Sequence, residues 1–532
     1  MTAPKLVMFL IGATALAIVL DIALLRVIKR HRQNGTRLKL KQIPLPNFSK
    51  LREIRLFHFL RECFASTRDL IQEIRKDERK TLRSFMLAAA IFFSASLGYV
   101  HRQALMVEGW QLWAWLGCIL FAIVSSLPKQ RPQFSLQKSD WWVLVPVLLG
   151  LFLRLISLES IPPGLHPDEV TTADFTIRHI YPPEGRTFYP MRSGPYTQPG
   201  PFYYLVYSSI QVFGRTFTAL RMPGVIAGTI AILATYALIA IRSDRRTALF
   251  AALLMSGFHF HMHWSRLALN NVWDTLWIPL TLAAFAWGWK TRWSGGAALS
   301  GAALGFSMYF YVGSRITIFL LPILIIQLWR EQSDYRQLVV HTGKLLAVAA
   351  VVAIPLIIFA LDNTDLFLSR ATVNWTLSDK ISEETGWWPI FKLLANQAWL
   401  SFAGFYTYSE QAAFYKSGVP FLIGFTGLFF IVGILWAIYR RKMLPVFWLV
   451  LTIFFGGFLI PGPPGTSHLI PAVPAMLWLV AMPLSAMDRN GYKRLVPVLI
   501  LLMIATDIYF YFGIYNPYGV DPDLSLPFPT IP

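Results

Sequence analysis

The sequence has few charged residues for its length. Asp, Glu, Lys and Arg make up 14% of the 532 residues, whereas 55% are hydrophobic. Soluble domains carry about 25% charged residues, so this composition excludes an ordinary soluble enzyme and favours a membrane protein. The alternating segments of about ten residues that mark a transmembrane β-barrel are also lacking.

Cysteine is nearly absent. The two cysteines are Cys63, in a basic segment, and Cys118, inside an apolar run. They form no disulfide framework, and they indicate no redox compartment. The first apolar run, residues 6–25, is followed by basic residues and has no small-residue cleavage site, so we interpret it as a retained span and not as a signal peptide.

Apolar runs long enough to cross a bilayer core of about 30 Å recur along the whole chain. They predict an all-α, polytopic integral membrane protein with about 13–14 transmembrane helices. The candidate spans are residues 6–27, 84–100, 111–127, 141–158, 219–241, 247–263, 272–289, 297–312, 315–329, 344–361, 418–438, 445–460, 468–486 and 494–513.

The basic residues between these runs orient the spans. Lys and Arg cluster in seven connections, and the positive-inside rule places those in the cytoplasm. The opposite, outer face then holds two long loops, 159–218 and 362–417, and the short turns 264–271, 312–315 and 461–467. This topology treats residues 199–214 as a juxtamembrane segment. If that run were a full span, every later loop would change sides.

About half of the net charge of +20 lies in residues 29–83, where an apolar stripe recurs at helical spacing. A basic amphipathic helix is typical of a segment that lies on an anionic leaflet. Nucleic acid is the alternative partner, but the remaining basic excess is explained by short cytoplasmic loops, so we expect none.

Two adjacent carboxylates lie where a span ends. Asp168 and Glu169 belong to "PPGLHPDEV" in the first long outer loop, and Pro167 suits the first position of a short helix. Acidic residues at a helix start can simply be favoured by the helix dipole. The alternative is that one carboxylate acts as a general base on a substrate at the membrane surface.

Cationic and polar side chains gather in the other outer loops. Arg266 and Asn271 lie in "HWSRLALNN", Tyr311 and Arg315 in "YFYVGSR", and His468 at a late helix start. An arginine there can snorkel, but its planar fork also matches the oxygens of a phosphate at headgroup depth. A pair formed by His259 and His263 has no evident third ligand, so a metal is not favoured.

These motifs resemble those of the polytopic GT-C glycosyltransferases, in the branch with protein O-mannosyltransferases and the lipid A aminoarabinose transferase. The resemblance covers about residues 140–490. Residues 1–130 carry none of its motifs, so the resemblance implies that they are an added N-terminal region and that residues 131–532 are the main membrane domain. It rests on Asp168-Glu169, "QPGPFYYLVYSSIQVFG" with "ALRMPGVIAG", "HWSRLALNN" and "HLIPAVPAM". It implies a GT-C-like fold, a lipid-phosphate-linked sugar donor and a catalytic aspartate at Asp168. The second turn departs from the family, because Asn270 and Asn271 stand where an acidic residue often occurs.

The expected activity is transfer of a sugar from a polyprenyl phosphate to an acceptor, at the outer face of a bacterial or archaeal plasma membrane, with inversion. Polyprenyl phosphate is a good leaving group, so the chemistry needs cations at the phosphate and one base for the acceptor. No cofactor is expected with certainty, and a divalent metal is possible but not favoured. Alternatives are a transporter or flippase of lipid-linked or anionic solutes, and a polymer ligase that uses a lipid pyrophosphate. The predicted site residues are Asp168 as base, Glu169 as its helper, Arg315, Arg266 and His468 at the phosphate, and His166, Asn271 and Tyr311 at the substrate.

Overall fold

The computed structural model describes residues 55–100, 110–130, 137–180, 199–365, 367, 386–407, 415, 417–460 and 465–516. Every regular element in these ranges is a helix, which confirms the all-α prediction. The chain divides into Met1–Glu62 and Cys63–Pro532 by its internal contacts, and the division falls inside helix α2. The predicted span 6–27, residues 29–54 of the basic segment and parts of both long outer loops lie outside the described residues.

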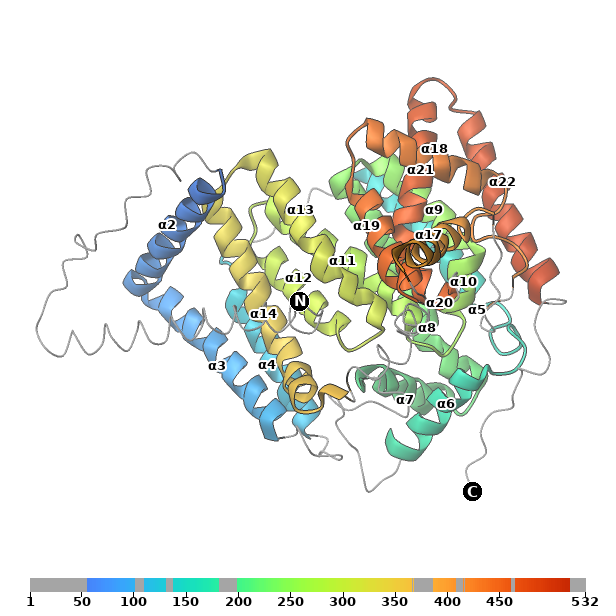
Figure 1. The fold of residues 1–532 in the computed structure, drawn as a ribbon. Coiled ribbons are helices and arrows are strands. Elements are labelled where there is room, and N and C mark those ends of the chain that lie inside the picture. The colour runs from blue at the N-terminus through green and yellow to red at the C-terminus, as the bar shows by residue number, and fades with distance from the viewer. Residues whose placement is uncertain are drawn as a thin grey trace, which may run out of the picture. The chain divides into compact units, whose positions relative to one another are not determined.

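Three helices come first among the described residues. They are α2 (Arg55–Lys76), α3 (Glu78–Val100) and α4 (Trp110–Ser126). The chain turns between α2 and α3 at Asp77, whose carboxylate accepts hydrogen bonds from the backbone N–H groups of Arg79 and Lys80 at 3.0 and 3.3 Å. α3 and α4 pack against each other and against α14 (Tyr335–Asp362) (Figure 1). Binding of the basic segment to the inner leaflet stays a prediction.

The middle of the chain contains most of the buried helices. Its elements are η2 (Lys138–Val143), α5 (Leu144–Leu155), α6 (Pro167–Phe175), η3 (Thr176–Ile180), α7 (Pro201–Phe213), α8 (Phe217–Arg242), α9 (Arg245–Gly257), α10 (His259–Ser265), η4 (Asn271–Trp273), α11 (Asp274–Lys290), α12 (Gly295–Ser307), η5 (Val312–Ile316), α13 (Thr317–Gln332) and α14.

The C-terminal elements complete the bundle. They are α17 (Trp387–Ala403), α18 (Phe425–Tyr439), α19 (Leu444–Ile453), η6 (Phe454–Phe458), α20 (Thr466–Leu469), η7 (Ile470–Ala472), α21 (Val473–Arg489), α22 (Leu495–Tyr509) and η8 (Phe510–Tyr515).

The core is built around α8, α9 and α21. α9 packs against both of the others, α8 also contacts α11, and α21 also contacts α18. Small residues allow the close approaches: a Cβ at Gly433 of α18 would lie 2.1 Å from the carbonyl oxygen of Leu479 in α21. Backbones in a membrane bundle approach in this way because small residues remove the side chains between them.

Helix lengths differ from the apolar runs of the sequence. Helices lie at all thirteen predicted spans that fall within the described residues. Six helical segments in this part of the chain are long and apolar enough to cross a membrane: Glu78–Val100, Phe217–Arg242, Val312–Gln332, Tyr335–Asp362, Ser467–Arg489 and Leu495–Tyr515. α5, α9 and α12 have 12 or 13 residues, and at 1.5 Å per residue they rise about 20 Å, less than the core of the bilayer.

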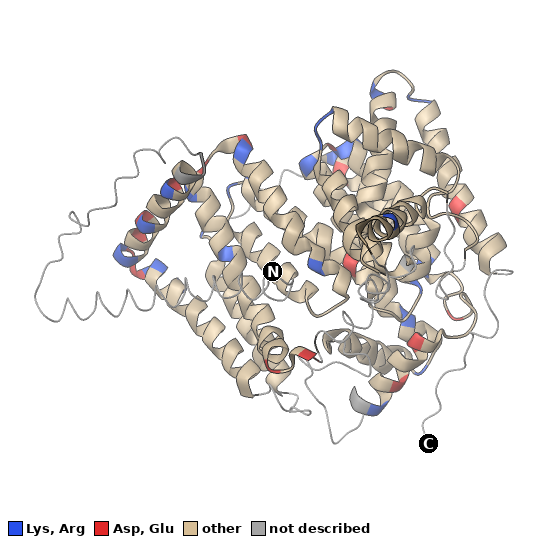
Figure 2. Cartoon of the chain, viewed as in Figure 1, with Lys and Arg blue, Asp and Glu red and all other residues tan. Residues whose placement is uncertain are grey.

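Breaks in the backbone explain the shorter helices. The apolar run 247–263 is divided at Phe258, which has extended backbone angles and separates α9 from α10. Apolar composition does not reveal such a break, because both halves are hydrophobic. α7, at the predicted juxtamembrane segment, has 13 residues and is likewise too short to span the core. Figure 2 shows that the long helices carry few charged side chains along their length, whereas α2 carries charges of both signs.

The predicted sidedness can be tested by cysteine labelling in intact cells, after both native cysteines are replaced. Cysteines at exposed Ser160 and Val312 should react with a membrane-impermeant maleimide, whereas one at exposed Tyr492 should react only after the cells are opened. The reason is that all seven basic connections lie on the side of Tyr492. Labelling of positions 160 and 312 from opposite sides would contradict a shared outer face.

Candidate active site

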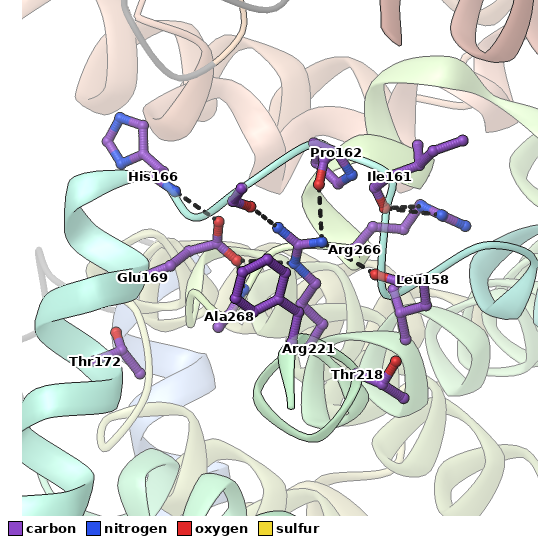
Figure 3. Close-up of polar contacts among 12 residues, drawn as sticks. Leu158, Ile161, Pro162, His166, Glu169, Thr172, Thr218, Arg221, Arg266 and Ala268 are labelled. Atoms are coloured by element: carbon purple, nitrogen blue, oxygen red, sulfur yellow. Dashed lines mark hydrogen bonds and ion pairs between the residues drawn. The ribbon is translucent and has the colours of Figure 1, made fainter. Parts of the chain in front are cut away.

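The loop that carries Asp168 wraps around one buried arginine. Arg221, from the first turns of α8, is fully buried. Its Nη1 donates to the carbonyl oxygens of Leu158 and Pro162, both at 3.0 Å, and its Nη2 donates to that of Gly164 (Figure 3). These three carbonyls have no partner within a helix, so the guanidinium replaces the water that would otherwise satisfy them.

Glu169 is the countercharge of Arg221. Its carboxylate is 1% exposed. Oε1 accepts from Arg221 Nε at 3.3 Å and from the backbone N–H of Ala268 at 2.8 Å, and Oε2 accepts from the backbone N–H of His166 at 3.0 Å (Figure 3). The last bond is half of a capping box at the start of α6. Glu169 therefore fixes the helix start in place and joins it to the second outer turn.

The guanidinium of Arg266 also donates its hydrogen bonds to backbone carbonyl groups. It is fully buried, and it donates from Nη1 to Leu153 O at 2.8 Å and from Nη2 to Ile156 O at 2.7 Å and Ile161 O at 2.9 Å. These carbonyls belong to the end of α5 and to the following loop. The structure does not support the prediction that Arg266 binds a donor phosphate, because its guanidinium would first have to give up these bonds.

The carboxylate of Asp168, unlike that of Glu169, is not bonded to any described residue. The residue is half-buried, and its carboxylate makes no hydrogen bond or ion pair with any described residue. Its backbone is held at both ends: the N–H donates to Nδ1 of His166 at 3.2 Å, and the carbonyl accepts from Thr172 Oγ1 at 2.9 Å. Asp168 is thus a carboxylate with a fixed backbone and a side chain available to a ligand.

His166 serves as the N-cap of α6. Its Nδ1 accepts the hydrogen bond from Asp168 N–H, so the ring proton of the neutral form is assigned to Nε2. Burial lowers the pKa of His166, against the opposing influence of Asp168 and Glu169. The neutral form is the one that this cap requires, because a protonated Nδ1 could not accept.

A second cluster brings together three other predicted residues. Tyr311 Oη lies 3.0 Å from Nδ1 of His468, and η5, which follows Tyr311, carries Arg315. The guanidinium carbon of Arg315 lies 4.8 Å from the centre of the Phe367 ring. Arg315, unlike Arg266, makes no hydrogen bond with a described residue.

Sequence reasoning missed Asp274 in this second cluster. It is the first residue of α11 and is fully buried, and its Oδ1 accepts from the backbone N–H of Ser314 at 2.9 Å and from the Ser314 hydroxyl. Asp274 lies just inside the predicted span 272–289, and no role is predicted for it from the sequence. The signal that could have found it is its position four residues after Asn270 in an otherwise apolar run.

One segment of chain connects the two clusters. Ala268 N–H binds Glu169, and Asn271 lies buried in η4 just before α11. Thr275, beside Asp274, contacts Nε2 of His261 at 2.9 Å, and Nδ1 of His261 accepts from a third buried arginine, Arg154, at 2.7 Å. Residues 266–275 therefore link the loop of Asp168 to the turn of Arg315.

The histidines of α10 do not form the metal pair that their spacing allowed. Both ring nitrogens of His259 contact protein groups, the Tyr415 hydroxyl at 2.6 Å and the Phe421 carbonyl at 2.9 Å. Among the described residues, no group of three or more His, Cys, Asp or Glu side chains is arranged to hold a metal ion.

Comparison with protein families supports the resemblance seen in the motifs. Residues 197–359 match the family described as dolichyl-phosphate-mannose-protein mannosyltransferase, which confirms the resemblance to the GT-C glycosyltransferases. The match spans less than a third of the chain and includes Arg221, Asp274 and Arg315. Asp168 and His468 lie outside it. Comparison with curated protein sequences gives no match.

Several solved structures of glycosyltransferases are similar to this chain. They include the oligosaccharyltransferase of Archaeoglobus fulgidus with Zn and sulfate (17% identity, TM-score 0.45, 73% of this chain and 54% of that one). A second is ArnT from Cupriavidus metallidurans bound to undecaprenyl phosphate, with 17% identity and a TM-score of 0.47 over 69% of this chain and 64% of that one. A third is arabinosyltransferase EmbB from Mycobacterium smegmatis, with 14% identity and a TM-score of 0.37 over 78% of this chain and 46% of that one. The chain thus covers less than two thirds of the length of each.

The structural role of the buried pair can be measured by its removal. Glu169→Ala leaves the Arg221 guanidinium buried without a countercharge, and loss of one partner of a buried ion pair costs about 3–5 kcal/mol of stability. We expect a clear fall in the midpoint of thermal unfolding. The matched control is Asp174→Ala on the same helix, which breaks an exposed pair with Arg178 worth at most about 1 kcal/mol. Equal falls in the two variants would contradict the role given to Glu169.

Proposed function

We propose that this protein is an integral membrane glycosyltransferase that moves a sugar from a polyprenyl phosphate to an acceptor, with Asp168 as the general base. The observation that carries the proposal is the contrast between two neighbouring carboxylates. Glu169 is buried and fully bonded, whereas Asp168 is half-buried and its carboxylate has no described partner. A fixed backbone with an available side chain is what a positioned base requires.

Arg315 is the residue proposed to bind the donor phosphate. Its guanidinium stacks on Phe367 and makes no hydrogen bond with a described residue, and a planar guanidinium binds phosphate oxygens in pairs. The family matched by residues 197–359 is named for a dolichyl-phosphate-linked sugar, which supports a lipid-phosphate donor. Tyr311 and His468, which contact each other beside this turn, are the neighbouring groups proposed to contact the donor.

The proposed reaction needs one base and one cation, which Asp168 and Arg315 supply. The acceptor hydroxyl or amine attacks the anomeric carbon, and its proton passes to a carboxylate oxygen of Asp168. The bond between the anomeric carbon and the phosphate oxygen breaks, and the lipid phosphate leaves with the electron pair. Arg315 stabilises the negative charge that gathers on the departing phosphate. Attack opposite the leaving group, without a carboxylate nucleophile, inverts the configuration at that carbon.

Glu169 and Arg266 take positioning roles in this proposal. Glu169 fixes the start of α6 through Arg221, and Arg266 holds the preceding loop through the carbonyls of Ile156 and Ile161. Neither is proposed to touch the reacting atoms. The proposed location is the outer face of a bacterial or archaeal plasma membrane, because the basic connections of the sequence lie on the other side.

The direct test is incubation of the purified protein in nanodiscs with a panel of polyprenyl-phosphate sugars and candidate acceptors. Release of the lipid phosphate together with a glycosylated acceptor supports the proposal. Transfer of the intact lipid-linked sugar across the membrane without its cleavage would instead support a flippase. Release of a lipid pyrophosphate would support a polymer ligase.

Asp168→Asn tests the base. The amide keeps the size of the side chain but cannot take a proton, and loss of general-base assistance slows a reaction by about 10²–10⁴-fold. We expect kcat to fall by that amount while binding of the lipid phosphate is unchanged. Asp174→Asn is the control, because it makes the same change on the same helix at an exposed ion pair. Sugar transfer by Asp168→Asn at the parent rate would show that the carboxylate is structural.

Arg315→Gln tests the phosphate contact. A hydrogen bond to a charged group contributes about 1.5–3 kcal/mol, so the KM for the donor should rise at least about tenfold. Arg330→Gln, near the other end of α13, is the control and should leave the KM unchanged. A parent-like KM in the Arg315 variant would remove this residue from the donor site.

A further inference from the structure

The turn that carries Arg315 is held in place from both ends. Before it, Tyr311 contacts His468 at 3.0 Å. Within it, Ser314, the residue directly before Arg315, is bound through both its backbone N–H and its hydroxyl to Oδ1 of Asp274. The direction of the Arg315 side chain therefore depends on a carboxylate that belongs to another helix.

The second carboxylate oxygen of Asp274, Oδ2, does not take part in the bonds to Ser314. Oδ2 is buried and has no hydrogen-bond partner among the described residues. It lies against Gly313, where an added Cβ would come within 2.1 Å of Oδ2 and within 2.5 Å of Pro471 Cγ. A buried carboxylate oxygen without a partner is costly, so its retention requires an explanation other than stability. The Arg315 guanidinium attracts the Asp274 carboxylate electrostatically.

Asp274 is itself firmly placed. It begins α11, and the next residue, Thr275, donates its hydroxyl to Val272 O at 2.7 Å while it contacts Nε2 of His261. Arg154 donates to the other ring nitrogen of His261. The backbone that carries Asp274 is thus fixed by a buried network that extends to α5.

We propose that Asp274 is the positioning residue of the donor site: its Oδ1 holds Ser314 and so sets the place of the Arg315 guanidinium that receives the lipid phosphate. This inference rests on the proposed function of Arg315. Asp274 does not touch the substrate in this scheme, and it acts only through the turn. Hydrogen bonding by Oδ1, and not the charge, is the property that the site needs, since a negative charge beside a phosphate is repulsive.

The test measures binding of a radiolabelled short-chain polyprenyl phosphate to the full chain in nanodiscs of neutral lipid. Asp274→Ala, which removes both bonds to Ser314, should weaken binding about tenfold. Asp274→Asn keeps an oxygen that can accept both bonds, so binding should stay within about threefold of the parent or become tighter. Ser314→Ala removes only the hydroxyl bond and should give an intermediate loss.

Two further variants separate positioning from general damage. In an Arg315→Gln background, Asp274→Ala should cause no additional loss, because residues that act through one another are not additive. Asp244→Ala is the matched control: Asp244 also accepts from the backbone N–H and the hydroxyl of one residue, Thr247, at the start of α9. It should leave binding unchanged, whatever its effect on the midpoint of thermal unfolding.

The outcomes distinguish this inference from the proposed function. If Arg315→Gln binds the lipid phosphate as the parent does, the donor site itself is wrong. If Arg315→Gln loses binding but Asp274→Ala does not, or if Asp274→Asn is as weak as Asp274→Ala, the positioning role is wrong. A purely additive loss in the double variant would also overturn it. Should Asp274→Ala fail to fold, the comparison of Ser314→Ala with Asp274→Asn decides between the same alternatives.

Discussion

The ion pair between Arg221 and Glu169 is the contact on which the arrangement of the first outer loop depends. A loop that leaves a membrane helix exposes carbonyl groups, and each must find a donor because water is scarce at that depth. Arg221 supplies donors to Leu158, Pro162 and Gly164, and Glu169 neutralises its charge. The same carboxylate binds the N–H groups of His166 and Ala268. One buried pair therefore joins the loop, the start of α6 and the second outer turn.

Two more buried arginines extend the same principle. Arg266 satisfies the carbonyls at the end of α5, and Arg154 donates to the carbonyls of Gly150 and Ser256 and to His261. Each guanidinium acts as a fixed set of donors where helices end or break inside the bundle. This use of arginine explains why short, interrupted helices such as α5, α9 and α10 persist in an apolar environment.

A rigid support of this kind is what interfacial chemistry needs. A base contributes to catalysis only if its position is fixed relative to the substrate, since misplacement by about 1 Å can cost 10²-fold in rate. The loop of Asp168 and the turn of Arg315 are both tied to residues 266–275, by Glu169 on one side and by Asp274 on the other. The loop and the turn that carry the two proposed catalytic and phosphate-binding groups are therefore both fixed by buried hydrogen bonds to the same segment of chain.

The sequence by itself determined the fold class and the helix positions, because apolar runs and basic connections follow directly from the bilayer as solvent. It also predicted that Asp168, Arg315, Tyr311 and His468 belong to the site, since turns between apolar runs are the places available to polar chemistry. It gave Arg315 and Arg266 the same role at the phosphate, and it did not show that Glu169 is buried in an ion pair whereas Asp168 is not. A guanidinium can bind a phosphate or a set of backbone carbonyls. A carboxylate can likewise act as a general base or accept the hydrogen bonds of a capping box. Only the tertiary structure shows that Arg266 and Glu169 are bonded to buried backbone groups and that no such bond to a described residue holds Arg315 or the Asp168 carboxylate, because folding alone fixes which side chains are buried against unpaired backbone groups. For the same reason Asp274, hidden at the start of an apolar run, became visible as part of the site only when its contact with Ser314 was known.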